Sequence, residues 1–304
     1  MRAAVVVCGS ALVCGAMGPV VGQTAQFRSR VDAVRVDALV TDGRRPIVGL
    51  TAASFELRDN GVVQKISDVH YETLPLNIIC VLDVSGSIAG EPLAHLKHAY
   101  QSVIEALAGE DRAALLTFAH NLDLHAAFTG DRGKLRDVVE RVETGGSTSL
   151  HDAVFSALTL RETDEGRTLM LLLTDGRDTS SWLSARKLVD AARRTDIVIY
   201  PVTIRTVASF VNLSGHSPRL GAQRQEPSER LLEALADDTG GRVVFASDDS
   251  ALESSFLSVL HEFRQRYVLS YTPERVSSTG WHTIDVKLRG RSGDVRARRG
   301  YFAR

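Results

Sequence analysis

The chain has 304 residues, of which 44% are hydrophobic and 24% charged, so its composition excludes a disordered protein and allows a substantial core. Its formal net charge of -1 at pH 7 provides no broad basic field, and we therefore expect no nucleic-acid partner. The length favours one large domain with an appendage.

The first 25 residues have the composition of a signal peptide. Arg2 supplies a positive charge, residues 3–17 are mostly apolar, and residues 18–25 form a carboxyl-terminal region rich in small side chains, as a cleavage site requires. The apolar stretch is interrupted by glycines and is short for a membrane span, although an uncleaved anchor is the alternative. We therefore expect a secreted, periplasmic or cell-envelope protein without stable membrane insertion after cleavage.

Cleavage of this signal peptide would remove two of the three cysteines, Cys8 and Cys14, and leave Cys80. A single cysteine cannot form an intrachain disulfide, so oxidation is not expected to stabilise the mature protein. Cys80 lies inside an apolar run, where a cysteine behaves mainly as a small hydrophobic side chain and not as a nucleophile.

Residues 26–73, which follow the signal peptide, show the period of two that is typical of β-strands. Alternate apolar residues run from Val34 to Val40, so this stretch offers one apolar face. The Asp-Asn-Gly tract at residues 59–61 predicts a hairpin turn between two short strands.

Residues 74–263 alternate between apolar runs and amphipathic stretches, as a doubly wound, mostly parallel α/β sheet requires. An apolar stripe from Leu93 to Leu107 is expected to face the sheet. The predicted strands cover residues 78–83, 113–118, 122–127, 168–174, 197–204 and 242–246. The predicted helices cover residues 91–107, 133–142, 150–160, 184–194, 228–238 and 250–263.

Residues 264–304 return to the period of two, with one apolar face at Ile284, Val286 and Leu288. The Arg-Ser-Gly tract at residues 291–293 predicts a second hairpin turn. Because a two- or three-stranded sheet is marginal alone, we expect this segment to pair with residues 26–73 in one small β-sandwich-like domain. The α/β domain would be inserted between the two halves.

The strongest candidate site begins at Asp83, which ends the apolar run of residues 76–82. Asp83, Ser85 and Ser87 place a carboxylate and two hydroxyls on one turn at the carboxyl end of a strand, where open α/β sheets bind ligands. Oxygen donors without Cys or His suit a small hard cation such as Mg²⁺ or Mn²⁺. One or two carboxylates only partly neutralise such an ion, which can then take another oxygen ligand from outside.

The spacing of Asp83, Ser85 and Ser87 resembles the metal-ion-dependent adhesion site of von Willebrand factor type A domains. Residues 145–148, Gly-Gly-Ser-Thr, resemble the second loop of that family. Residues 171–176, Leu-Leu-Leu-Thr-Asp-Gly, resemble its third loop and follow in the family's order. The resemblance implies a Rossmann-like fold and a bound divalent cation, either Mg²⁺ or, as alternatives, Mn²⁺ or Ca²⁺.

The same resemblance implies a role for each residue of the site. Ser85, Ser87 and Thr148 would ligate the metal, while Asp83 and Asp175 would act through water or from behind the ligands. It also implies a binding and adhesion module, not an enzyme, whose cation is bridged by an aspartate or glutamate carboxylate of a protein partner. Segments near both ends look like the secreted bacterial von Willebrand type A proteins first grouped in acidobacteria: residues 31–40, 49–55, 58–61, 266–273 and 298–302.

Two enzymatic interpretations use the same residues. A magnesium-dependent phosphatase-like hydrolase would use Asp83 as its nucleophile, as haloacid-dehalogenase phosphatases do. Their second aspartate is replaced here by Ser85, which leaves no evident general acid. A serine hydrolase is disfavoured because the sequence contains no Gly-x-Ser-x-Gly elbow. The phosphatase-like hydrolase is therefore the alternative function.

Three features have two interpretations each. Asp178 is either a partner of Asp175 behind the metal ligands or a helix cap. His151 and Asp152 either touch a ligand or form the first turn of the following helix, where the carboxylate complements the helix dipole. The long segment of residues 206–227 either shapes partner specificity or is only a connection.

Overall fold

The computed structural model describes residues 33–43, 45–71, 74–160, 166–204 and 227–303. The predicted signal peptide, residues 1–25, lies outside these ranges, as does the segment 206–227 except for its last residue. Among the described residues, every helix is too short or too polar to span a lipid bilayer.

Six strands of the described residues form one sheet in the order β11-β10-β9-β6-β7-β8. Within it β8 runs antiparallel to its neighbour β7, and the other neighbouring pairs are parallel. The predicted mostly parallel α/β sheet is therefore confirmed. The strands are β6 (Leu76–Asp83), β7 (Arg112–Phe118), β8 (Leu122–Thr129), β9 (Arg167–Leu173), β10 (Val198–Ile204) and β11 (Val244–Ala246).

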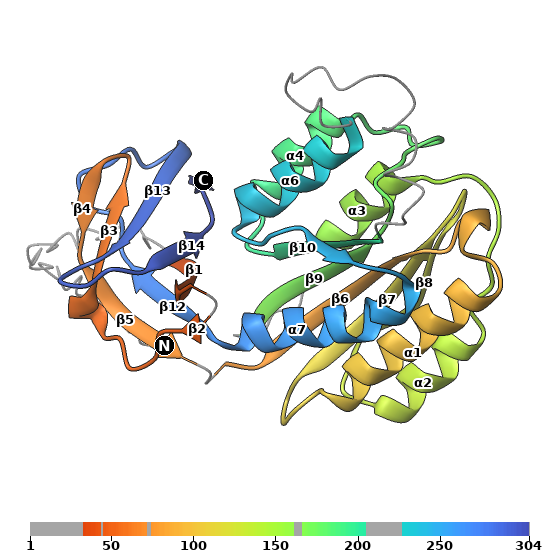
Figure 1. Cartoon of the computed structure of the whole chain (residues 1–304). Coiled ribbons are helices and arrows are strands. Elements are labelled where there is room, and N and C mark those ends of the chain that lie inside the picture. The colour runs from red at the N-terminus through yellow and green to blue at the C-terminus, as the bar shows by residue number, and fades with distance from the viewer. Residues whose placement is uncertain (1–32, 44, 72–73, 161–165, 205–226, 304) are drawn as a thin grey trace, which may run out of the picture. The chain divides into compact units, whose positions relative to one another are not determined.

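Helices cover both faces of this sheet (Figure 1). β6 is buried along its whole length, and its alternation divides the core: Ile78 and Cys80 belong to one apolar cluster, Ile79 and Val81 to the other. The first cluster includes side chains of α1 (Glu91–Glu105), α2 (Arg132–Glu140) and α7 (Leu252–Arg264). The second includes side chains of α3 (Leu150–Leu158), α4 (Ala185–Ala192) and α6 (Pro227–Thr239).

Cys80 lies fully buried in the middle of β6. Its burial raises the pKa of the thiol to about 12, because the thiolate would be a charge in an apolar core. The side chain therefore stays protonated and packs as a small hydrophobic group, which confirms the prediction for this residue.

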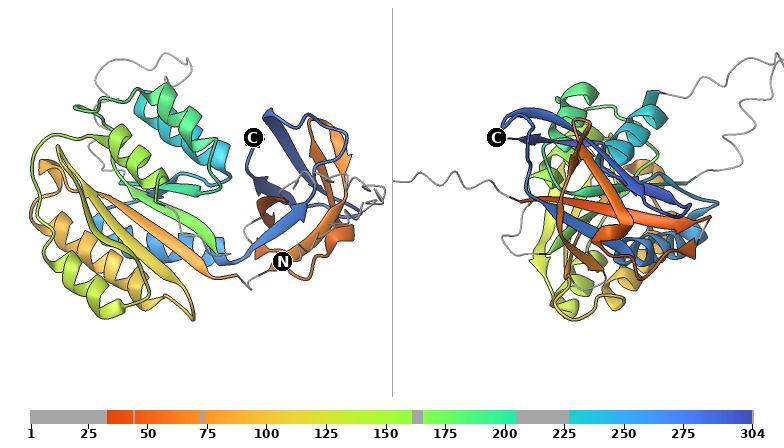
Figure 2. Two further views of the ribbon diagram at one scale, coloured as in Figure 1. Left: turned by 180° about the vertical axis from the view of Figure 1, so that it is seen from behind. Right: turned by 90° about the vertical axis from the view of Figure 1, so that its left-hand side faces the viewer.

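Strands from the two ends of the chain pair with one another in two further sheets. One has the order β14-β1-β12-β5, with β2 paired to β1, and the other has the order β15-β13-β3-β4. Strands of both segments lie side by side in Figures 1 and 2, as β1 and β12 do with Val34 opposite Tyr271. The amino-terminal strands are β1 (Val34–Asp42), β2 (Arg45–Pro46), β3 (Phe55–Asp59), β4 (Val62–Gln64) and β5 (Ile66–Tyr71). The carboxyl-terminal strands are β12 (Arg266–Tyr271), β13 (Gly280–Leu288), β14 (Asp294–Ala297) and β15 (Gly300–Ala303). Short 3-10 turns are η1 (Ala52–Ser54), η2 (Gly86–Ile88) and η3 (Asp249–Ala251).

The first predicted hairpin is confirmed and the second is wrong. Asn60 and Gly61 have φ angles of 47° and 80° between the antiparallel strands β3 and β4, as a tight two-residue turn requires. After β13, however, the chain leaves its sheet, and β14 pairs with β1, where Ala38 is opposite Ala297. β14 thus pairs with one edge of β1. In this position Val295 packs against the apolar cluster of the outer sheets.

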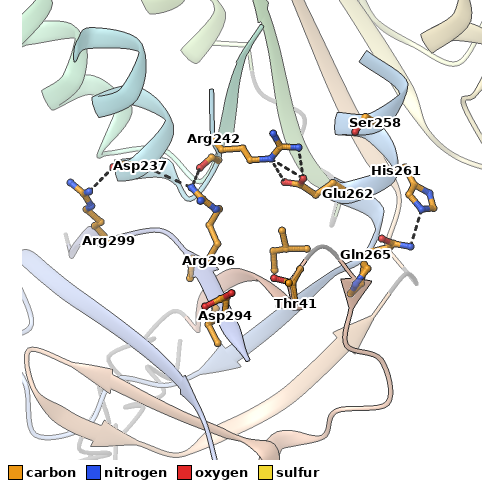
Figure 3. A pocket seen from close by; sticks show the side chains of 16 residues that line it. Thr41, Asp237, Arg242, Ser258, His261, Glu262, Gln265, Asp294, Arg296 and Arg299 are labelled. Carbon is orange, nitrogen blue, oxygen red and sulfur yellow. Dashed lines mark hydrogen bonds and ion pairs between the residues drawn. The ribbon is translucent and has the colours of Figure 1, made fainter. Parts of the chain in front are cut away.

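A cleft of about 970 Å³ is lined by charged side chains from α6, α7 and the β14 region (Figure 3). Arg242 pairs with Glu262 at 2.7 Å, and Arg299 pairs with Asp237 at 2.6 Å. Arg296 lies 3.9 Å from the same Asp237 carboxylate. The arginines of this cleft are thus matched by carboxylates of α6 and α7, which leaves little net charge to attract an ionic ligand.

Candidate metal centre

The first two candidate loops are joined by backbone hydrogen bonds at the carboxyl end of β6. The N–H of Gly145 donates to the carbonyl of Val84 at 2.9 Å, and the N–H of Gly86 donates to the carbonyl of Gly146 at 3.4 Å. The turn that carries Ser85 and Ser87 therefore lies directly beside the loop that carries Thr148.

The second and third loops are joined through Thr148. Its carbonyl accepts hydrogen bonds from the backbone N–H groups of Thr179 at 2.8 Å and Ser180 at 3.1 Å. Its own N–H donates to the hydroxyl of Thr179 at 2.9 Å, and the hydroxyls of Ser149 and Ser180 are 2.8 Å apart. All three loops that the sequence singles out thus meet at one end of the sheet.

Asp83 lies at the bottom of this site, with only 3% of its surface exposed. One carboxylate oxygen accepts the N–H of Ser85 at 3.0 Å, and the other accepts the hydroxyl of Thr174 at 3.3 Å. The hydroxyls of Ser85 and Ser87 are 3.3 Å apart. Side chains from the ends of two neighbouring strands, β6 and β9, therefore converge on one small group of oxygens.

Asp175 lies at the rim of the site, where 48% of its side chain is exposed. Its carboxylate accepts the N–H of Arg177 at 2.9 Å, and the Arg177 guanidinium lies 3.6 Å away. It is close enough to Asp83 for its negative charge to affect that buried carboxyl group. The site therefore has one buried carboxylate and one that faces solvent.

The pKa of Asp83 is raised above its usual value, chiefly because burial disfavours the charged carboxylate. Hydrogen bonds from Ser85 oppose this shift, and the negative charge of Asp175 adds to it. The ionised form of Asp83 is therefore unfavourable in the protein alone, and a cation between the loops would stabilise it.

The oxygens present fit a small hard cation. Two neighbouring ligands of an octahedral ion, each at about 2.1 Å, lie about 3.0 Å apart, close to the separation of the Ser85 and Ser87 hydroxyls. Within the described part of the chain, no group of three or more His, Cys, Asp or Glu side chains could hold a metal. The donor set here is therefore a mixture of hydroxyls and carboxylates.

Two neighbours of the site have other partners. Asp178 accepts a hydrogen bond from the hydroxyl of Ser181 at 2.5 Å, and its carboxylate lies 3.4 Å from Nδ1 of His151. Asp152, in the first turn of α3, accepts the N–H groups of Trp182 and Leu183, each at 2.9 Å. Both carboxylates therefore shape the third loop.

Thr174 and Thr179 also belong to the site, although the sequence motifs alone do not predict a role for them. The first binds the Asp83 carboxylate, and the second fixes the loop of Thr148. The concentration of hydroxyl side chains between residues 174 and 181 is the signal that could have revealed them.

Gly146 is the tightest backbone position of the second loop. Its φ is +81°, and a Cβ atom there would clash with Nδ1 of His120. We expect Gly146→Ala to destabilise the protein by about 1–2 kcal/mol through the left-handed conformation alone, and to weaken cation binding because the loop must move.

Thermal unfolding with and without Mg²⁺ measures both effects of Gly146→Ala. Gly49→Ala is the matched control, because Gly49 has a φ of +75° and open space around its Cβ position, outside the site. An unchanged cation response in Gly146→Ala would show that this loop does not depend on the close contact with His120.

A model of the von Willebrand factor type A domain matches residues 77–258, more than half of the chain. The chain belongs to the von Willebrand factor type A family. The matched range contains all three loops of the candidate site.

Curated relatives share this von Willebrand type A region at low identity. An uncharacterized protein of Synechocystis sp. is 26% identical over 220 residues, which are 70% of this chain and 44% of that protein. Inter-alpha-trypsin inhibitor heavy chain H4 of Bos taurus is 24% identical over 292 residues, 90% of this chain and 30% of the relative. The chain therefore spans less than half the length of the curated relatives it matches.

Solved structures show the same von Willebrand type A fold. Proximal thread matrix protein 1 of the mussel byssus, solved with a zinc-occupied MIDAS motif, is 16% identical with a TM-score of 0.51, covering 69% of this chain and 50% of that chain. A von Willebrand factor type A protein of Catenulispora acidiphila is 12% identical with a TM-score of 0.50, covering 91% and 75%. At these identities the likeness concerns the fold.

Proposed function

We propose that this protein is an exported binding and adhesion module that recognises an acidic group of a protein partner through a divalent cation. The observation that carries this proposal is the buried carboxylate of Asp83 beside the paired hydroxyls of Ser85 and Ser87, at the point where three loops meet. Mg²⁺ is the cation we expect, with Mn²⁺ or Ca²⁺ as alternatives.

In this proposal Ser85, Ser87 and Thr148 hold the ion, and Asp83 and Asp175 orient its waters and reduce its charge. Because the direct ligands are neutral hydroxyls, the ion stays electrophilic and attracts a carboxylate from outside. The mussel protein with its zinc-occupied MIDAS motif supports a divalent cation at such a site. Export rests on the signal-peptide composition of residues 1–25, which favours a secreted, periplasmic or envelope location.

We also propose that residues 26–73 and 264–304 form one small β-sandwich-like domain that carries the von Willebrand type A domain, residues 74–263. The strand pairs β1 with β12 and β3 with β13 support this division, because each joins the two ends of the chain. Their side chains share an apolar cluster that includes Val36, Leu57 and Leu269.

Mg²⁺ is expected to stabilise the folded protein. At a free concentration ten times the dissociation constant, binding to the native state alone contributes about 1.4 kcal/mol. For a protein of this size this raises the melting temperature by about 2–4 °C. Calorimetry with Mg²⁺ and with a chelator measures the shift, and no shift at millimolar Mg²⁺ would contradict an intrinsic site.

Asp83→Asn is expected to abolish this Mg²⁺ response without unfolding the protein. Because burial raises the pKa of Asp83 above its unfolded value, the folded state binds this proton more tightly. The free energy of unfolding of the metal-free protein should therefore fall as the pH rises from the pKa of Asp83 in the unfolded state through its raised pKa in the folded state. Asp83→Asn has no titrating carboxyl group at this position, so above that pH range it should be at least as stable as the metal-free wild type.

Cation binding should show the opposite dependence on pH, because the ion requires the ionised carboxylate. Calorimetric titration of wild type with Mg²⁺ should show affinity falling as pH is lowered through the raised pKa of Asp83. A metal-free Asp83→Asn variant that melts far below wild type would reveal a structural role for this carboxylate.

The hydrolase alternative is tested with the same preparations. Sustained turnover of a generic phosphate ester with Mg²⁺, lost in Asp83→Asn, would overturn the adhesion proposal. We expect no turnover, because Ser85 occupies the place of a second carboxylate and supplies no general acid.

A further inference from the structure

Trp182 is the most exposed large hydrophobic side chain of the described residues, with 98% of its surface accessible. It lies in the third loop of the metal centre, between β9 and α4. Tryptophan side chains are enriched at the centres of protein interfaces, where a partner covers the ring. An indole in this position is therefore a candidate contact for whatever binds at the cation.

The loop holds the backbone of this residue firmly. Both oxygens of Asp152 accept backbone N–H groups, one from Trp182 and one from Leu183, each at 2.9 Å. Nδ1 of His151 lies 2.9 Å from the carbonyl of Leu183, and the hydroxyl of Ser181 accepts the His151 N–H at 3.0 Å. Because α3 fixes this segment, a partner that covers the indole loses little conformational entropy of the loop.

Trp182 lies in the loop that is hydrogen-bonded to Thr148, one of the proposed ligands of the cation. Ser180 donates its N–H to the carbonyl of Thr148. Trp182 follows Ser180 by two positions, so the Cα atoms of Ser180 and Trp182 are at most about 7 Å apart. Phe155 is 42% exposed and follows Asp152 by three positions on α3, which places it one turn along the same side of the helix. The loop after β9 and the neighbouring helix α3 therefore each carry an exposed aromatic side chain.

Two polar side chains that hold this loop already have hydrogen-bond partners. Asp152 uses both oxygens for the loop, and Ser181 both accepts from the α3 backbone and donates to Asp178. Neither side chain is therefore a free partner for the hydroxyl groups of a sugar stacked on the ring. An apolar side chain needs no such partners, and its burial on the ring is favourable through the removal of apolar surface from water.

We infer that the partner is a protein segment that carries an aspartate or glutamate close in sequence to an apolar side chain. The carboxylate binds the cation, and the apolar side chain packs on Trp182. This inference rests on the proposed cation-dependent function and adds the second half of the recognition element.

The test uses the full-length protein and fluorescent synthetic octapeptides in which a leucine or phenylalanine lies one to four positions from a single aspartate. Matched peptides replace the apolar residue by serine or the aspartate by asparagine. In Mg²⁺ we expect at least one acidic-apolar peptide to bind, and the serine version and Trp182→Ala each to weaken it at least ~10-fold, as truncation of an interface anchor does. The asparagine version and Asp83→Asn should abolish binding.

Two controls separate the inference from folding and from the proposed function. Val48→Ala, which removes another exposed apolar side chain outside the von Willebrand type A domain, should leave affinity unchanged, and Trp182→Ala should melt as wild type does. In a Trp281→Phe background, the emission of Trp182 should shift to shorter wavelength when the peptide binds. No shift, equal affinity of Trp182→Ala, or no binding of any peptide while calorimetry shows bound Mg²⁺ would overturn the inference alone. Absence of Mg²⁺ binding would overturn the proposed function as well.

Discussion

Asp59→Ala is expected to lower the free energy of unfolding by about 3–5 kcal/mol, because it removes the acceptor of a fully buried hydrogen-bond cluster. Asp59 is completely inaccessible to solvent. Its carboxylate accepts the hydroxyls of Tyr271 at 2.8 Å and Tyr301 at 2.9 Å, and lies 2.7 Å from Nδ1 of His282. Each of these groups would lose its contact with the carboxylate while it stays buried.

The cluster joins both outer sheets, because Tyr271 belongs to β12 and the other three residues belong to β3, β13 and β15. Burial raises the pKa of Tyr301 to about 12, so this hydroxyl keeps its proton and donates at neutral pH. Nε2 of His282 is buried without a hydrogen-bond partner, so the polar contacts of this buried ring are those of Nδ1, to Asp59 at 2.7 Å and to the Tyr301 hydroxyl at 3.1 Å.

Denaturant unfolding of wild type and Asp59→Ala measures the loss directly. The matched control is Asp285→Ala, since Asp285 forms an exposed pair with Lys287, and such pairs contribute at most about 1 kcal/mol. A loss in Asp59→Ala no larger than in this control would show that the cluster is rearranged or hydrated when the carboxylate is absent.

Removal of residues 265–304 is expected to make residues 33–71 sensitive to protease under native conditions. β1 lies between β12 and β14, β5 pairs with β12, and β3 pairs with β13, so the deletion removes most partners of the amino-terminal strands. The hairpin of β3 and β4 and the short pairing of β1 with β2 are too small to fold alone.

Limited proteolysis followed by mass spectrometry locates the cuts, with the full-length chain as the control. Residues 74–263 should remain resistant, and a fragment of that range should still be stabilised by Mg²⁺. If residues 33–71 stay protected after the deletion, the proposed shared β domain is wrong.

The fold of the von Willebrand type A region and the position of its site could be predicted from sequence because their signals are local. An apolar run that ends at Asp83 defines both a central strand and the place where its polar residues emerge. The hydroxyls of Ser85 and Ser87 lie on the same turn, so their proximity needs no tertiary information.

Contacts between distant segments could not be read in this way. The backbone of Trp182 is held by Asp152, which lies 30 residues earlier and in sequence is only an acidic residue at a helix start. The prediction of a hairpin at residues 291–293 is wrong because the turn residues do not determine whether the next strand, β14, pairs with β13 or with β1. The partners of Asp59 are likewise set by strand order.

The pairing of the two ends of the chain also determines when they can fold. Asp59 and Tyr301, which touch in the folded protein, are separated by 242 residues. At about 5–20 residues per second, a ribosome needs on the order of ten to fifty seconds to synthesise that distance. During this time β1 and β3 expose edges that can pair with other chains. Folding of the α/β domain shortens the effective loop between the two ends, and this lowers the entropic cost of pairing them once the last strands are made.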